Sequence, residues 1–138
     1  MPSDIVFLDS AYAIALAAPE DECHNRASEL AAEIKGNNVP VVTTDAVILE
    51  IGDALSKPKH RPAAGKLIRS ILTDRLIEVV PLTPAILRRA FDLFRQRPDK
   101  GWGLTDCVSF IVMADRQIRR ALTTDEHFEQ AGFVAMLK

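Results

Sequence analysis

The sequence has few of the residues that mark several protein classes. Its 138 residues include only two cysteines, Cys23 and Cys107, which are far apart and form no CxxC pair. We therefore expect reduced thiols and neither a disulfide scaffold nor a zinc site. No stretch approaches the roughly 20 apolar residues of a membrane-spanning helix. With 48% hydrophobic and 26% charged residues, the composition predicts one globular domain over residues 1–138, located in the cytoplasm.

Several catalytic motifs are also missing. The chain has no G-x-x-x-x-G-K-[ST] phosphate loop and no G-x-S-x-G nucleophile elbow, and Gly101-Trp102-Gly103 is too short for a dinucleotide loop. The three histidines, His24, His60 and His127, have no metal-ligand spacing to one another or to a cysteine. These absences exclude the common nucleotide-binding and serine-hydrolase motifs, and they disfavour zinc.

The charge is unevenly distributed along the chain. The net charge is −2, which alone would argue against a nucleic-acid partner. However, residues 1–56 contain 2 basic and 10 acidic residues, whereas residues 57–100 contain 11 basic and 4 acidic ones. This asymmetry predicts surfaces with different electrostatic roles, although the two segments can also simply neutralise each other across the fold.

Short apolar runs alternate with helical patterns along the whole chain. Five strands are predicted, at Ile5–Leu8, Val39–Thr43, Leu76–Val80, Ala121–Thr123 and Phe133–Leu137. Six helices are predicted between them, at Ala11–Ala18, Asp21–Lys35, Asp45–Ser56, Ala63–Thr73, Pro84–Arg97 and Leu104–Asp115. Thr123-Thr124-Asp125-Glu126 resembles a capping box that begins a short further helix. The alternation predicts an α/β fold with a mostly parallel sheet, whose ligands would lie beyond the carboxyl ends of the strands.

Four acidic residues occupy positions from which they can converge at that edge. Asp9 ends the first strand, and Asp125 follows the fourth. Glu50 lies within an otherwise apolar helix, and Asp106 lies at the start of a helix that is apolar nearly all round. Taken singly, each has an ordinary structural use, as a helix cap, a first-turn acid or a solvated side chain.

Taken together, the four acids favour a cation site. Two unit charges about 4 Å apart repel by roughly 4 kcal/mol at an effective dielectric constant near 20. A cluster of four carboxylates would therefore be unstable without a cation, and hard oxygen ligands suit Mg²⁺ or Mn²⁺. The chemistry that such a site predicts is metal-assisted phosphoryl transfer.

The spacing of these residues resembles that of PIN-domain proteins of the VapC toxin type. The resemblance covers nearly the whole chain, and its later segments are the more specific. Four segments carry it: Phe7-Leu8-Asp9-Ser10, Thr43 to Glu50, Asp99 to Cys107, and Leu122 to Phe128 followed by Gly132-Phe133. The sequence departs from the family's pattern at Ala11, Gly103 and Cys107, but not at the four acids.

The resemblance implies a three-layer α/β/α PIN-like fold with a roughly five-stranded sheet. It implies a Mg²⁺- or Mn²⁺-dependent endoribonuclease whose catalytic and metal-binding residues are Asp9, Glu50, Asp106 and Asp125. It also implies a cognate antitoxin protein as a partner and a homodimer. Asp9 and Asp106 are the strongest candidates for direct ligands, whereas Asp125 would bind directly or through water and Glu50 would hold a second metal or orient the attacking water.

Further residues receive roles around this site. Ser10, Thr105 and Thr124 are candidates for hydrogen bonds to the ligands, with helix capping as the alternative for all three and the favoured role for Thr124. Trp102 would stack on an RNA base or pack its loop against the core, and packing is favoured. Five basic residues are candidates for binding RNA phosphates, with a solvated helical face as the alternative: Lys57, Lys59, Arg61, Lys66 and Arg69. The sequence thus predicts an acidic pocket beside a basic rim.

Two other functions remain open at this point. One is a PIN-like RNA-binding or scaffold protein without turnover. The other is a phosphatase or phospho-relay domain that forms an aspartyl-phosphate at Asp9. However, Asp9-Ser10-Ala11 lacks the second aspartate that a haloacid-dehalogenase-type mechanism needs two residues later.

Overall fold

The computed structural model describes residues 5–138. Its centre is a five-stranded sheet in the order β3-β2-β1-β4-β5, and every neighbouring pair is parallel. The strands are β1 (Val6–Leu8), β2 (Val41–Thr44), β3 (Ile77–Val80), β4 (Arg120–Leu122) and β5 (Val134–Ala135). The predicted α/β class and parallel five-stranded sheet are therefore confirmed.

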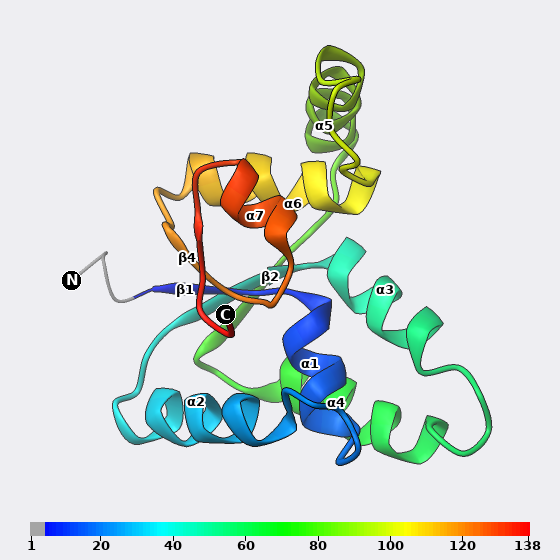
Figure 1. Cartoon of the computed structure of the whole chain (residues 1–138), viewed down its shortest axis with the longest axis vertical. Helices are drawn as coiled ribbons and strands as arrows, with labels where there is room; N and C mark the ends of the chain where they lie inside the picture. Colours follow the sequence, from blue (N-terminus) through cyan, green and yellow to red (C-terminus); the bar gives the residue numbers. More distant parts are fainter. Residues whose placement is uncertain (1–4) are drawn as a thin grey trace.

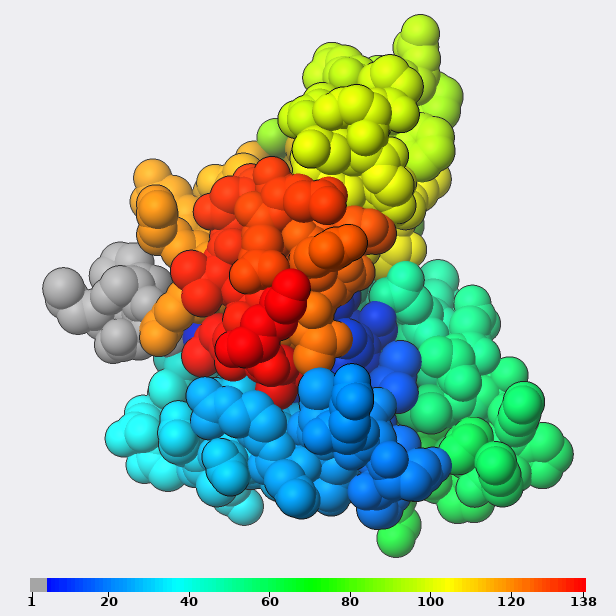
Figure 2. All heavy atoms as spheres, viewed as in Figure 1, coloured from blue at the N-terminus to red at the C-terminus, as the bar shows by residue number. Residues whose placement is uncertain are grey.

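Helices cover both faces of the sheet, giving the predicted three layers (Figure 1). One layer contains α1, α2 and α4, with α3 packed beside α1 and α4, and the other contains α6 and α7. Helix α5 packs on α6 and projects from the rest of the molecule (Figure 2). The helices are α1 (Ser10–Ala17), α2 (His24–Gly36), α3 (Asp45–Ala54), α4 (Arg61–Thr73), α5 (Pro84–Gln96), α6 (Leu104–Asp115) and α7 (Glu126–Gln130).

The core lies between the sheet and these helices. All three residues of β1 are at least 95% buried, as expected of a central strand with both faces covered. Phe7 and Phe110 both pack against Phe128 of α7. Such aromatic contacts add to the free energy gained by burying their apolar area. The short helix α7, which follows β4, is therefore anchored to the centre of the domain.

Local sequence signals explain most of the helix boundaries. Thr44 begins α3, because its hydroxyl accepts a hydrogen bond of 3.2 Å from the Val47 amide. Thr83 caps α5 in the same way, by accepting from the Ile86 amide, and Pro84 occupies the first turn of that helix. Helix α6 begins and ends at the predicted residues, and Gly103 occupies its N-cap position.

The capping-box prediction at Thr123 is wrong. Helix α7 begins at Glu126, and its N-cap is Asp125, whose Oδ1 accepts from the His127 amide at 2.9 Å. The Thr123 hydroxyl is fully buried and bonds elsewhere. The pattern has the residue types of a capping box, but the N-cap is Asp125, two residues after Thr123. The Thr123 side chain is therefore available to contact Asp9, which follows the neighbouring strand β1.

Candidate metal centre

The site is built around Asp9, which directly follows β1. Asp9 occupies the N-cap position of α1 but makes no capping hydrogen bond. Its side chain is 96% buried, and its Oδ2 accepts a hydrogen bond of 2.7 Å from the Thr123 hydroxyl. The residue expected to cap a helix therefore directs its carboxylate along the sheet edge, toward the end of β4.

Thr123 links two of the acidic residues. While its hydroxyl donates to Asp9, the same oxygen accepts from the backbone amide of Asp125 at 3.0 Å. Since β1 and β4 are adjacent and parallel, residues that follow them leave the sheet at the same edge. One buried hydroxyl thus fixes the spacing between the loops that carry Asp9 and Asp125.

Glu50 reaches the site from the middle of α3. The Ser10 hydroxyl, at the first position of α1, donates a short hydrogen bond to Glu50 Oε1. Glu50 is partly buried, whereas Asp53, one turn later on the same helix, is exposed. Ser10 therefore contacts Glu50 directly, whereas Asp53 lies on the exposed face of α3.

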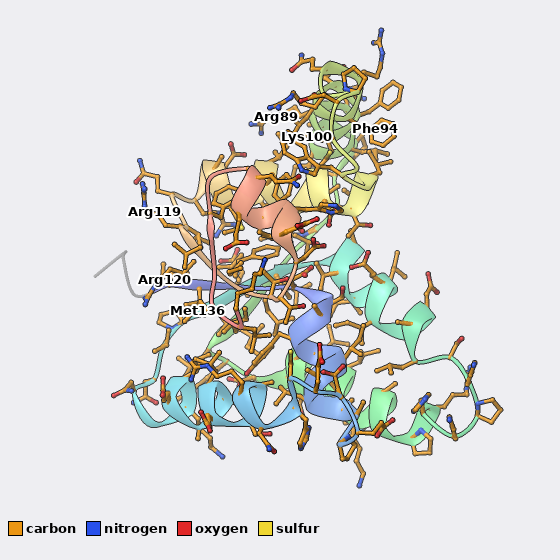
Figure 3. The ribbon with its side chains drawn as sticks, viewed as in Figure 1. Arg89, Phe94, Lys100, Arg119, Arg120 and Met136 are labelled. Atoms are coloured by element: carbon orange, nitrogen blue, oxygen red, sulfur yellow. The ribbon has the colours of Figure 1, made fainter. Side chains whose placement is uncertain are left out.

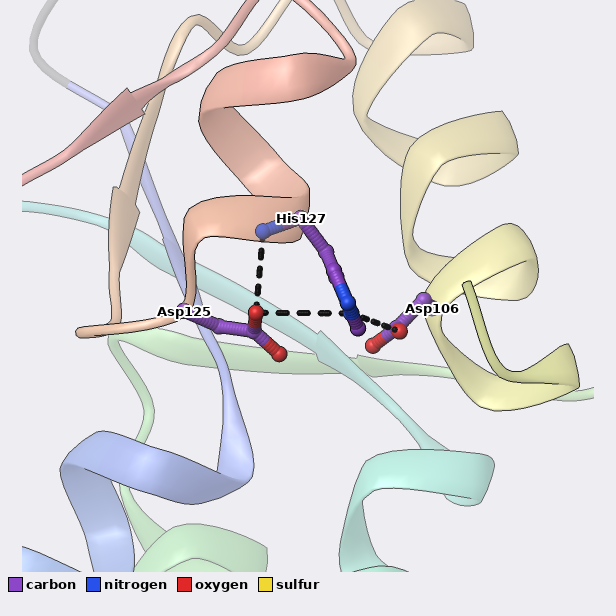
Figure 4. Close-up of side chains that lie close together, drawn as sticks. All are labelled: Asp106, Asp125 and His127. Carbon is purple, nitrogen blue, oxygen red and sulfur yellow. Dashed lines mark hydrogen bonds and ion pairs between the residues drawn. The ribbon is translucent and has the colours of Figure 1, made fainter. Parts of the chain in front are cut away.

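Asp106 and Asp125 are joined through a histidine. Asp106 Oδ2 accepts from the Gly103 amide at 3.0 Å and lies 2.9 Å from Nδ1 of His127. The same Nδ1 is 3.4 Å from Oδ1 of Asp125. Figure 4 shows the imidazole reaching from α7 to the start of α6, beside both carboxylates. One potential ligand atom from each of these three residues lies within 4.8 Å of the others.

The surroundings of Asp9 disfavour its ionised form. Burial raises the pKa of Asp9 to about 6, the Thr123 and Ser10 hydrogen bonds oppose the rise, and the charges of Glu50 and Asp106 add to it. Within residues 5–138, no lysine or arginine forms an ion pair with Asp9, Glu50, Asp106 or Asp125. Among the described residues, no direct ion pair with a lysine or arginine therefore offsets the repulsion between these carboxylates.

These residues fit a divalent cation. Four carboxylates supply the hard oxygen donors that Mg²⁺ and Mn²⁺ prefer, and no soft ligand lies among them. Cys107 is fully buried on α6 beside Asp106, and burial is the main cause of its raised thiol pKa. A protonated, buried thiol is a poor ligand, so the donor set does not favour a thiolate-bound metal.

The other predicted residues lie at varying distances from this cluster. Thr105 is partly buried on α6, next to Asp106, and lines a groove that also includes Glu50. Thr124 is partly buried between Thr123 and Asp125. Trp102 is packed rather than free, because it is 94% buried, donates to Gln130 Oε1 at 3.0 Å and meets Phe110 edge-on.

The five candidate RNA-binding residues are all exposed. They lie in the loop after α3 and on α4, at the end of α3 that is farther from the sheet (Figure 1). In the described part of the chain none of the five forms an ion pair, whereas Arg89, Arg97 and Arg116 are each paired with a carboxylate. The loop and α4 therefore carry free positive charge, but their side chains are not part of the acidic cluster.

Sequence reasoning missed two members of the network, Thr123 and His127. The spacing of His127 to other histidines and cysteines gives no signal, because its partners are aspartates from two different elements. Thr123 stands in a pattern that is typical of a helix cap, which hides its contact with Asp9. The signal that would have found both is the Thr123-x-Asp125-x-His127 sequence after a strand, where alternate side chains can face the same edge of the sheet.

Comparisons with known proteins agree with this geometry. The family model described as PIN domain matches residues 6–134. The chain belongs to the PIN domain family. A search of curated proteins found no match.

Among solved structures, the PIN domain is similar to the Mycobacterium tuberculosis toxin VapC20, described as cleaving the sarcin-ricin loop. The TM-score is 0.84 at 25% identity, covering 94% of this chain and 96% of VapC20. The fold also matches VapBC2 from Rickettsia felis, solved bound to a DNA fragment from its promoter. There the TM-score is 0.64 at 15% identity, covering 95% of this chain and 96% of the matched chain. No helix in residues 5–138 is long and apolar enough to cross a membrane.

Proposed function

We propose that this PIN domain is a Mg²⁺- or Mn²⁺-dependent endoribonuclease and the toxin of a type II toxin–antitoxin system. The observation that carries the proposal is the convergence of Asp9, Glu50, Asp106 and Asp125 at one sheet edge, where no lysine or arginine within residues 5–138 forms an ion pair with any of them. Such a cluster holds uncompensated negative charge, which a divalent cation would neutralise.

The four carboxylates would hold the metal, which when bound would polarise the scissile phosphate, lower the pKa of a bound water and stabilise the leaving oxygen. Thr123 orients Asp9, because its hydroxyl donates to Oδ2 at 2.7 Å. Ser10 orients Glu50 in the same manner. Asp9 and Glu50 are thus each fixed by a neighbouring hydroxyl before metal or RNA arrives, which reduces the reorganisation needed for catalysis.

The exposed basic segment also has a role in this proposal. We propose that Lys57, Lys59, Arg61, Lys66 and Arg69 bind the phosphates of the RNA strand. They are exposed and without ion pairs in residues 5–138. Contacts of this kind contribute affinity but no sequence information, and they weaken as salt increases. Once the four site acids are neutralised, 17 basic residues face 15 acidic ones, which removes the electrostatic objection to RNA.

An antitoxin partner and a cytoplasmic location follow from the toxin proposal. The support for both is the likeness to VapC20, described as a toxin, and the overall match to its chain. An active nuclease of this type is tolerated by its own cell only when it is held inactive. Expression of the chain alone in a bacterial host should therefore stop growth, and the variant Asp106→Asn should not.

We further propose that two copies of the chain associate through α3 and α5. A groove of about 320 Å³ between these helices and α6 is lined by Leu49, Leu82, Leu87 and Leu104. Figure 2 shows the notch below the projecting α5. Leu49 and Phe91 are 65% and 49% exposed, and Figure 3 shows Phe94 and Arg89 on opposite sides of α5.

A second copy is the occupant that the charges favour. The α3 side of this surface carries the exposed acid Asp53, whereas the exposed Arg88 and Arg95 lie on α5. A twofold contact would place α3 of each copy, which carries Asp53, opposite α5 of the other, which carries Arg88 and Arg95. Twofold symmetry requires a self-complementary patch of this kind.

The function can be tested with matched variants on one helix. Glu50→Gln removes a proposed ligand, and Asp53→Asn makes the same chemical change one turn away on the exposed face. Purified proteins are incubated with RNA in Mg²⁺ or Mn²⁺. We expect cleavage by the wild type and by Asp53→Asn, and loss of cleavage for Glu50→Gln. RNA binding without cleavage by the wild type in either metal would instead identify a non-catalytic RNA-binding protein.

A further inference from the structure

His127 has a position in the site that the four-carboxylate account leaves unexplained. It lies in the first turn of α7, with 27% of its side chain exposed, and its Nδ1 faces Asp106 Oδ2 at 2.9 Å. Its backbone amide donates to Asp125 Oδ1 at 2.9 Å. A single residue thus contacts two proposed metal ligands that come from different elements.

The direction of the Asp106 hydrogen bond follows from the acceptor. An ionised carboxylate has only lone pairs to offer, so the hydrogen must be on Nδ1 of the imidazole. Asp106 Oδ2 then receives two donors, the His127 ring and the Gly103 amide at 3.0 Å. No side chain or loop amide within residues 5–138 donates to Oδ1, which is therefore the oxygen available to a cation.

The imidazole is also held in place by its surroundings. Phe128, the next residue, is fully buried, and Asp125 caps the helix that carries both. On the other side, a Cβ at Gly101 would lie 3.7 Å from Nε2, so the loop before α6 passes close to the ring. The ring therefore bridges α7 and the start of α6 in a defined orientation, rather than facing solvent (Figure 4).

We propose that His127 is a positioning residue that holds Asp106 in the orientation needed to bind the catalytic metal ion. This inference rests on the proposed function, because it assumes that Asp106 is a ligand. By donating to Oδ2, the ring turns Oδ1 toward the cluster and separates the carboxylates of Asp106 and Asp125. Partners of this kind around a metal ligand typically contribute 10- to 100-fold in metal affinity or activity.

The test compares three substitutions at one position. In Asn, the amide nitrogen occupies nearly the place of Nδ1, whereas in Gln it lies nearer the place of Nε2. His127→Ala removes the donor, His127→Asn restores it, and His127→Gln misplaces it. Glu126→Ala is the matched control, because Glu126 is exposed on the same helix and its charge acts on Lys138. Circular dichroism and urea unfolding establish that each variant is folded.

Two readouts are measured with Mn²⁺ as the probe. The first is Mn²⁺ binding without RNA, followed by the electron paramagnetic resonance signal of the free ion. The second is the RNA cleavage rate as a function of Mn²⁺ concentration. We expect His127→Ala to raise the Mn²⁺ concentration at half-saturation by about 10- to 100-fold in both readouts. The maximal cleavage rate should stay within a few-fold of wild type, His127→Asn should recover most of the affinity, and His127→Gln should not.

Other results would overturn the inference in recognisable ways. Unchanged Mn²⁺ affinity in His127→Ala, with wild-type cleavage intact, removes the positioning role but leaves the proposed function standing. A lower maximal rate at saturating Mn²⁺ with unchanged affinity assigns His127 to the reaction itself. Failure of His127→Asn to recover the Mn²⁺ affinity that His127→Ala loses shows that donation to Asp106 is not the role of the ring, and it favours direct ligation by the imidazole. If the wild type neither binds Mn²⁺ nor cleaves RNA, the proposed function itself has failed.

Discussion

The charge of Asp9 should make the metal-free protein less stable at neutral pH. The pKa of this carboxyl is raised from 3.8 to about 6, mainly by burial. Below pH 3.8 the group is protonated in both the folded and the unfolded chain, so it costs nothing. As the pH rises through the interval from 3.8 to about 6, the unfolded chain ionises first, and folding loses stability. Above pH 6 the loss is complete and constant.

The size of this loss follows from the shift. A difference of about 2 pKa units at 1.36 kcal/mol each amounts to about 3 kcal/mol at pH 7.5. Asn is neutral at every pH, nearly isosteric with Asp, and its oxygen can still accept from Thr123. In EDTA, Asp9→Asn should therefore raise the free energy of unfolding by about 3 kcal/mol at pH 7.5. At pH 3.5 it should change it by less than about 1 kcal/mol, the scale of a near-isosteric change.

Urea unfolding in EDTA at the two pH values measures this difference directly. Groups that titrate equally in both proteins cancel, and Asp53→Asn controls for the loss of an exposed carboxylate. Adding Mn²⁺ at 1,000 times its dissociation constant should reverse the order at pH 7.5, because it stabilises the wild type by about 4.1 kcal/mol, which exceeds the difference of about 3 kcal/mol in EDTA. An Asp9→Asn protein that is less stable than wild type at pH 7.5 in EDTA would refute the reasoning, as would a difference independent of pH.

Three further changes test separate parts of the structure. Thr123→Val leaves the Asp125 amide and Asp9 Oδ2 without their shared partner. Urea unfolding should therefore show a free energy of unfolding that is lower by about 1–3 kcal/mol. An unchanged free energy of unfolding would remove Thr123 from the network. Lys66→Glu combined with Arg69→Glu should weaken RNA binding, measured by fluorescence anisotropy in a catalytically inactive background. The slope of log K against log salt should fall in magnitude by about 0.7 per lost phosphate contact. An unchanged slope would assign these residues to a solvated face. Phe91→Lys should halve the mass measured by light scattering if α5 forms the dimer contact, and a wild type that is already monomeric would contradict that contact.

The fold was largely predictable because it is encoded in local patterns. Buried strands such as Val6–Leu8 consist of short apolar runs, and α6 is apolar nearly all round. These patterns make the alternation of strands and helices recognisable in the sequence. The clearest error lies at the start of α7, where the sequence offers several polar residues in succession. Thr123, Thr124 and Asp125 can each cap a helix, and only the tertiary contact with Asp9 decides which of them does so.

The approach of Asp9 and Asp125 to one another could be predicted from the sequence, whereas the partner of each supporting side chain could not. Asp9 and Asp125 follow adjacent strands, so the topology alone brings them to one edge. By contrast, the contact of Ser10 with Glu50 joins residues 40 positions apart, and that of His127 with Asp106 joins residues 21 apart. Such pairs depend on how helices dock onto the sheet, and this docking leaves no periodic signal in the sequence.

The most direct test of the central claim is the RNA cleavage rate of the purified protein with Mg²⁺, with Mn²⁺ and with EDTA. The account predicts cleavage with at least one of the metals and none in EDTA. It also predicts a rate for Asp106→Asn that is lower by roughly 100-fold or more, since metal catalysis contributes several kcal/mol. Cleavage that persists undiminished in EDTA, or in Asp106→Asn, would contradict a carboxylate-bound metal ion as the catalyst.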